Sequence, residues 1–215
     1  MSFNSSYKRW HKPKRDVIND DGSLKKGQTH QGYYRVANRD KYVGDPNLVI
    51  YRSSWEFAFC KWCDASPSIK RWSSEPIKVP YYDRVSKLEE CRKLGLDPNN
   101  PRNWVIKNYN TDFWVEIDKG GERPEKWFIE IKPKDKLSKP KQIAAHAPLK
   151  EIRRYNMLMK EYLINEAKFA ALKDWAEKNG SKFYVFTEDT LIHYGIIGGR
   201  FDYDNEKTKY QQRLK

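Results

Sequence analysis

Cysteine is scarce in this 215-residue chain, and its three cysteines do not suggest a disulfide framework. Cys60 and Cys63 have C-x-x-C spacing, but they fall inside a predicted helix, whereas a redox motif is expected at a helix N-terminus. A zinc site would need a second pair of ligands at suitable spacing, which the sequence lacks. We therefore expect all three cysteines, including Cys91, to be buried core thiols.

Long apolar stretches are also missing. No apolar run approaches the roughly 20 residues of a membrane span. The first ten residues lack the apolar segment of a secretory signal. These features predict no membrane partner, and a protein that stays in the cytoplasm where it is made.

Negative charge is in deficit, because 42 Lys and Arg residues face 29 Asp and Glu residues, giving a net charge of +13. This balance favours a polyanionic partner, most simply nucleic acid, although charge alone is not specific. Aromatic residues are plentiful, with 8 Trp and 14 Tyr, and they indicate a folded core rather than a disordered chain.

Hydrophobic periodicity is absent at the N-terminus, where residues 1–41 are polar, basic and aromatic. We expect this segment to be an extended arm that lies along DNA or a partner protein; a flexible tail is an equally good interpretation. Residues 42–195 are predicted to form the folded domain, and residues 196–215 a polar C-terminal tail.

The remaining pattern alternates between helical and strand periodicity, which predicts an α/β fold with a mixed sheet whose last strand follows a helical crossover. A helix is expected to start at Ser53 or Ser54, either of which can cap it, and to end near Asp64. The other expected elements are strands over 47–51, 69–82, 104–117, 127–132 and 182–187, and helices over 88–94 and 149–178.

The predicted strand 127–132 carries two charges at alternate positions, Glu130 and Lys132, so both side chains point to the same face. On its own this pattern fits an exposed ion pair on an edge strand. Two further carboxylates change that interpretation. Asp112 lies in the preceding strand, and Glu56 lies on the apolar face of the first helix.

These residues can form a metal-dependent site. If strands 104–117 and 127–132 form a hairpin, Asp112 and Glu130 become neighbours that can share one Mg²⁺, with the Ile131 carbonyl as a further oxygen ligand. Lys132 could orient or deprotonate an attacking water. Glu56 could complete the metal shell or hold a second ion; alternatively, it is a first-turn glutamate satisfied by the helix dipole.

Four short motifs occur in a fixed order, and together they carry a family resemblance: RSSWE at 52–56, SSEPI at 73–77, TDF at 111–113 and EIKP at 130–133. The chain resembles the PD-(D/E)xK nuclease superfamily over about residues 42–192. Within it, the chain is most similar to the head-completion nucleases of contractile-tailed, T4-like phages and to the TnsA-type endonuclease subunit of bacterial transposases. Thr111 stands where the superfamily name has proline.

This resemblance implies a restriction-endonuclease-like fold and a Mg²⁺- or Mn²⁺-dependent endonuclease, with Glu56, Asp112, Glu130 and Lys132 as its catalytic set. It also implies action on the end of packaged double-stranded DNA before tail joining, near head, portal or neck proteins. Such a protein would work in the host cytoplasm during assembly and could remain in the virion. The alternatives are a non-catalytic head or neck protein with this fold, and a transposase or repair endonuclease subunit.

Several other polar residues near these motifs are candidates for supporting roles. Glu75 is either a carboxylate behind the metal ligands or half of a surface pair with Arg71 or Lys78, and the structural role is favoured. Asn165 and Lys168 are placed on the side of the long helix that faces the sheet edge, where they either approach the site or, as is more common, are solvated. The residues expected to contact DNA are Arg52, Lys134, Lys136, Lys139 and Lys141.

Overall fold

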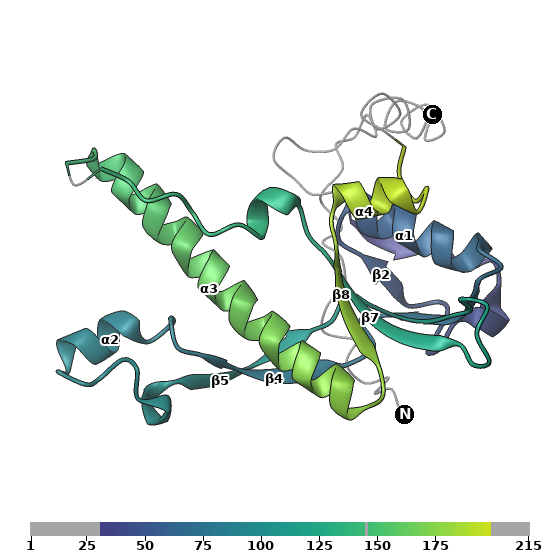
Figure 1. Cartoon of the computed structure of the whole chain (residues 1–215), viewed down its shortest axis with the longest axis horizontal. Helices are drawn as coiled ribbons and strands as arrows, with labels where there is room; N and C mark the ends of the chain where they lie inside the picture. The colour runs from purple at the N-terminus through teal and green to yellow at the C-terminus, as the bar shows by residue number, and fades with distance from the viewer. Residues whose placement is uncertain (1–30, 145, 199–215) are drawn as a thin grey trace. The chain divides into compact units, whose positions relative to one another are not determined.

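The computed structural model describes residues 31–144 and 146–198, which divide into two compact units (Figure 1). The first unit comprises the described parts of Met1–Ile77 and Tyr184–Lys215 together with Thr111–Ile131. The second comprises Lys78–Asn110 and Lys132–Phe183. Among the described residues, no helix has both the length and the apolar character that a membrane span requires.

A four-stranded mixed sheet with flanking helices confirms the predicted fold class. The hairpin expected around the turn at 118–124 is present, because the strand that precedes this turn pairs antiparallel with the strand that follows it. The last strand follows the long helix, as a crossover requires. In sheet order, the strands are β3 (Ile69–Ser74), β6 (Phe113–Ile117), β7 (Glu125–Ile131) and β8 (Lys182–Phe186).

Helix α1 (Ser54–Ala65) packs its apolar side on this sheet and forms the core of the first unit. The rings of Phe59 and Phe113 lie 4.6 Å apart between centroids. Cys60 and Cys63 are fully buried beside them, and Cys91 is buried in the second unit; all three are free thiols, as predicted. Burial raises the pKa of the Cys63 thiol, so it behaves as an apolar core residue.

Part of the expected N-terminal arm is folded. Strand β1 (Gly32–Tyr34) pairs antiparallel with β2 (Val49–Tyr51), and Val36 is buried in the core. The buried carboxylate of Asp64, in the last turn of α1, accepts hydrogen bonds from the Tyr34 hydroxyl and from the backbone N–H groups of residues 37 and 38. These long-range contacts tie the segment down where local periodicity gave no signal. Residues 1–30 and 199–215, which include the rest of both predicted arms, lie outside the described residues.

Two segments predicted as single long strands are each divided between two sheets. Residues 69–82 form β3 and β4 (Lys78–Asp83), and residues 104–117 form β5 (Val105–Asn110) and β6. β4 and β5 pair antiparallel as a separate two-stranded ribbon. The break in the first segment falls at Glu75, whose φ of 46° turns the chain immediately before Pro76. The Glu75 N–H donates to the Asp112 carbonyl at 2.8 Å, so the two breaks lie together.

In the second unit, helix α3 (Leu149–Lys178) packs against β4. The helix spans the predicted residues and ends before Gly180, whose φ of 63° suits a glycine after a helix C-terminus. The inner face of the ribbon buries Val79, Tyr81 and Tyr109. The other elements of the described chain are short: η3 (Arg39–Lys41), α2 (Leu88–Lys93), η4 (Pro101–Asn103), η5 (Lys134–Lys136) and α4 (Glu188–His193).

Candidate active site

The β6–β7 hairpin places Asp112 beside Glu130 and Ile131, as the sequence predicted. Phe113 is registered opposite Ile129, and the same register places Asp112 opposite Glu130. The Oδ2 atom of Asp112 accepts a hydrogen bond from the Ile131 backbone N–H at 2.9 Å. Because Asp112 lies where the chain passes from the ribbon into the sheet, this bond fixes its carboxylate against β7.

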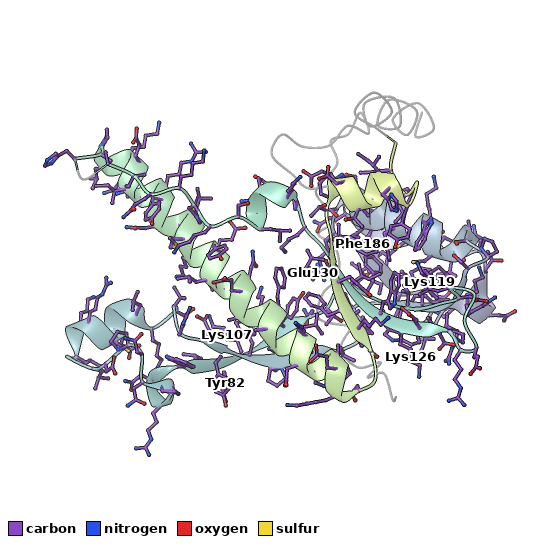
Figure 2. All side chains as sticks on the ribbon, viewed as in Figure 1. Tyr82, Lys107, Lys119, Lys126, Glu130 and Phe186 are labelled. Atoms are coloured by element: carbon purple, nitrogen blue, oxygen red, sulfur yellow. The ribbon has the colours of Figure 1, made fainter. Side chains whose placement is uncertain are left out.

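Glu130 is a nearly fully buried carboxylate, with 2% of its surface exposed. It lies on β7, where residues 127–131 are all buried (Figure 2). A carboxylate is costly to bury unless it is paired, hydrogen-bonded or bound to a metal. Its position therefore argues against the exposed ion pair that the Glu-x-Lys pattern alone suggests. Lys132 follows Ile131 directly and is the first residue of the second unit.

Glu56 caps the helix that carries it. Ser53 is the N-cap of α1, and its Oγ atom accepts a hydrogen bond from the Glu56 N–H at 3.1 Å. The Glu56 carboxylate in turn accepts from the Ser53 hydroxyl at 3.0 Å and from the Arg52 N–H at 2.7 Å. This reciprocal arrangement resembles a capping box, except that the backbone donor is the N–H of Arg52, the residue before the N-cap. The helix-terminus interpretation of Glu56 therefore accounts for its local contacts.

The electrostatic environment of Glu56 includes more than the hydrogen bonds of a helix cap. Burial raises its pKa most strongly, and the hydrogen bonds from Arg52 and Ser53 oppose that rise. The negative charges of Glu75 and Glu130 raise the pKa further. The charges of Glu75, at the break after β3, and of Glu130, on β7, therefore act on Glu56, and a cation bound near Glu56 would relieve that repulsion.

Glu75 belongs to this group, although the sequence favoured a surface pair with Arg71 or Lys78. Instead, the Nε atom of Arg52 binds Glu75 Oε1 at 2.8 Å. The other carboxylate oxygen, Oε2, is buried and has no hydrogen-bond partner. Such an orphaned atom and a positive φ at a residue other than glycine are both typical of functional sites. In the sequence, only the Glu-Pro dipeptide hints at the positive φ or the orphaned oxygen of Glu75, so sequence reasoning could not have found them.

The residues expected to contact DNA differ in their surroundings. Arg52 is engaged with Glu75, and Lys136 forms an ion pair with Glu161 at 3.0 Å. In the connection before α3, three further lysines are exposed: Lys134, Lys139 and Lys141.

Of the two alternatives for Asn165 and Lys168, solvation is wrong for Asn165, and Lys168 is half-buried. Asn165 is 6% exposed, and its Nδ2 atom is buried without a hydrogen-bond partner. The ammonium of Lys168 lies 5.2 Å from the ring centroid of Tyr109 and 5.8 Å from that of Tyr81. Lys168 therefore lies on the side of α3 that packs on the ribbon, which the sequence pattern did not reveal.

The donors around the hairpin suit a hard dication such as Mg²⁺, because they are carboxylate and carbonyl oxygens. The orphaned Glu75 Oε2 and the raised pKa of Glu56 also fit a site that gains from a bound cation. Within the described part of the chain, however, no three His, Cys, Asp or Glu side chains are gathered so that they could hold a metal ion.

One protein family and one known protein are similar to this chain over this region. The family model for the N-terminal part of TnsA-like endonucleases matches residues 66–188, which include Glu75, Asp112, Glu130 and Lys132. The head completion nuclease of Enterobacteria phage T4 is 33% identical over 169 residues, covering 79% of this chain and 98% of that protein.

Proposed function

This chain belongs to the family of TnsA-like endonucleases and phage head completion nucleases, and we propose that it hydrolyses DNA phosphodiester bonds with Mg²⁺ or Mn²⁺ during completion of a phage head. The observation that carries this proposal is the hydrogen bond between Asp112 and the Ile131 N–H. That bond holds one carboxylate against the strand that carries Glu130 and leads to Lys132.

The proposed roles follow from the chemistry of the side chains. Asp112 and Glu130 would hold the ion together with the Ile131 carbonyl. Glu56, which is not gathered with both of them in this structure, would join the shell when the ion binds or would hold a second ion. When bound, such an ion polarises the scissile phosphate and lowers the pKa of coordinated water. Lys132 would orient the attacking water, accept or guide its proton, and stabilise charge on the phosphate.

The biological setting of the proposal comes from the similarity to the phage T4 protein, which extends over nearly all of that protein. The substrate would be double-stranded DNA, and portal or neck proteins would be neighbours during assembly in the host cytoplasm. The main rival is a structural head protein that has this fold without using it for cleavage.

Cleavage by the purified protein tests the proposal. We expect nicking or cutting of duplex DNA with Mg²⁺ or Mn²⁺ and none with EDTA. Ca²⁺ should support binding without cleavage, because its larger and looser coordination shell does not align the attacking water. If the protein binds DNA but never cleaves it with any of these ions, the structural rival is favoured.

Two substitutions separate chemistry from metal binding. Lys132→Ala should lower the cleavage rate by about 10²- to 10⁴-fold and leave metal affinity intact, because it removes the proposed proton-transfer group. Asp112→Asn should lose rate and metal affinity together, because an amide oxygen is a weaker ligand for a hard dication. Lys126→Ala, an exposed position on the same strand, is the matched control. Full activity in Lys132→Ala would place the cleavage elsewhere or in a contaminant.

A further inference from the structure

The β4–β5 ribbon has two faces of different character. Side chains alternate along each strand, so Val79, Tyr81 and Tyr109 point inward and are buried. The outer face is formed by three cross-strand pairs. These pairs are Lys78 with Asn110, Pro80 with Asn108, and Tyr82 with Ile106.

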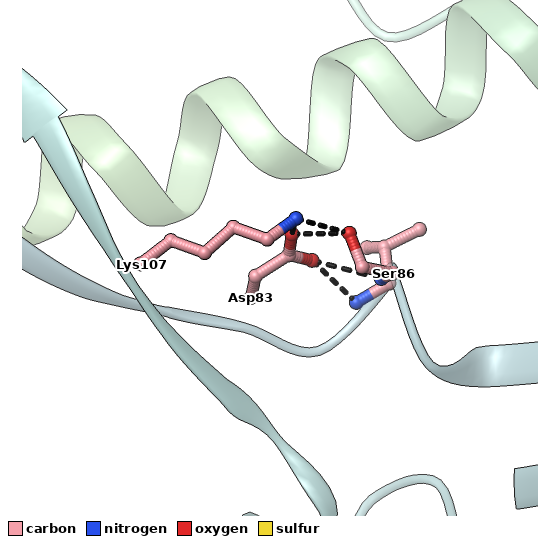
Figure 3. A network of polar contacts seen from close by, with 4 residues as sticks. Asp83, Ser86 and Lys107 are labelled. Carbon is pink, nitrogen blue, oxygen red and sulfur yellow. Dashed lines mark hydrogen bonds and ion pairs between the residues drawn. The ribbon is translucent and has the colours of Figure 1, made fainter.

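The inner face is firmly held within the second unit. Lys168 of α3 lies over the rings of Tyr81 and Tyr109, which gives the ribbon a cation–π contact as well as apolar packing. At the end of β4, Asp83 has no exposed side-chain surface and accepts a hydrogen bond from Lys107 of β5 at 2.6 Å (Figure 3). Asp83 also binds the Ser86 hydroxyl and the N–H groups of residues 85 and 86. The ribbon is therefore a preformed element.

The outer face places large apolar side chains in solvent. Tyr82 is 57% exposed and Ile106, directly opposite it, is 63% exposed. The ring of Trp104 packs edge-on against Tyr82, with the centroids 6.1 Å apart. Beyond this pair, Arg84 and Arg102 are exposed near the end of the ribbon.

The charged and polar residues of the outer face indicate the kind of partner that it binds. Its six residues include one cation, Lys78, two amides and no acidic residue. The one carboxylate at this end of β4, Asp83, faces inward and is neutralised by Lys107. A face with amide donors and acceptors, apolar groups and positive charge complements a polyanion that carries base edges.

We propose that the outer face of the β4–β5 ribbon docks into the major groove of duplex DNA. The inference rests on the proposed function and adds where the substrate is held. The major groove is about 12 Å wide and admits a two-stranded β-ribbon. Asn108 and Asn110 would contact base edges, Tyr82 and Ile106 thymine methyl groups, and Lys78 a backbone phosphate.

Equilibrium binding of a fluorescent duplex by the full chain in Ca²⁺ tests the ribbon. The double variant Tyr82→Ala/Ile106→Ala should weaken binding by at least about tenfold, the loss expected for a groove contact of ordinary strength. Lys78→Ala should make the slope of log affinity against log salt shallower by about one, because one phosphate contact is lost. Tyr33→Ala, which removes another exposed tyrosine in the first unit, should bind as wild type does.

A photo-cross-linking residue placed at Ile106 gives a second readout that does not depend on stability. It should cross-link to DNA; cross-linking only to a phage protein would overturn the inference. Failure of the inference is also distinguishable from failure of the proposed function. If wild type cleaves DNA and the double variant binds duplex with wild-type affinity, the ribbon has no such role and the proposed function stands. If the double variant loses duplex binding but wild type cleaves no DNA, the role of the ribbon stands and the proposed function fails.

Discussion

At the scale of single residues, Glu56 serves the fold and the candidate site together. Its carboxylate caps α1 through Ser53 and the Arg52 N–H, and it also lies in the field of Glu75 and Glu130. A helix cap alone would not need a half-buried position near two further acids. The fold therefore places Glu56 in the field of two further carboxylates, an arrangement that is useful if it is to bind a cation.

The raised pKa of Glu56 predicts a pH-dependent contribution to stability. A carboxyl whose pKa is higher in the folded than in the unfolded chain favours folding below its ordinary value of about 4.3, and this contribution is lost as pH rises through the raised pKa. Without metal, the free energy of unfolding of Glu56→Gln minus that of wild type should therefore rise when the pH is raised from 4.5 to 8. The change should exceed the roughly 0.5 kcal/mol scatter of surface substitutions.

Urea unfolding at the two pH values measures this difference. Glu166→Gln is the control, because Glu166 is exposed and its carboxylate accepts a hydrogen bond from Tyr162 on its own helix. An equal stability difference between Glu56→Gln and wild type at both pH values would mean that burial and the neighbouring acids do not act on Glu56 as described.

At the scale of elements, the ribbon depends on one buried acid. Burial by itself would raise the pKa of Asp83, but hydrogen bonds from Lys107, from Ser86 and from the backbone outweigh it and lower the pKa to about 2. The carboxylate form thus stabilises the fold above the ordinary pKa of about 3.9, and this contribution is lost as pH falls from there through about 2.

Removing that charge tests how much it stabilises the second unit. Asp83→Asn should cost about 2–4 kcal/mol at pH 7, because Lys107 keeps only the Ser86 hydroxyl and loses its anionic partner, and a buried network is left incomplete. The matched control is Asp174→Asn, whose ion pair with Lys178 has a similar length, 2.7 Å, but is exposed. It should cost less than about 1 kcal/mol. Equal losses of unfolding free energy in the two variants would contradict the stabilising role of the buried Asp83 carboxylate.

At the scale of the whole molecule, the net charge of +13 predicts strongly salt-dependent DNA binding. If at least four phosphates are neutralised, affinity should fall by about a hundredfold between 50 and 200 mM salt, because each contact releases condensed counterions. Titration of duplex DNA at several salt concentrations gives the slope. Affinity that does not respond to salt would assign the charge to a protein partner or to solubility.

The sequence by itself determined the features that depend on local pattern. The period of the apolar residues defined α1, α3 and the β6–β7 hairpin, and a capping serine marked the start of α1. The hairpin made Asp112 and Glu130 expected neighbours. The exact register, with Phe113 opposite Ile129, came from the structure, because the connection at 118–124 is long enough to allow other registers.

The tertiary structure decided what depends on contacts between distant segments. It divided two expected strands between the sheet and the ribbon, since the bond from Glu75 to Asp112 links positions 37 residues apart. It also brought Glu75 to Arg52, buried Asn165 and folded residues 32–41 against the core. Such pairings are selected by packing and by the need to satisfy buried polar groups, which a local pattern does not encode.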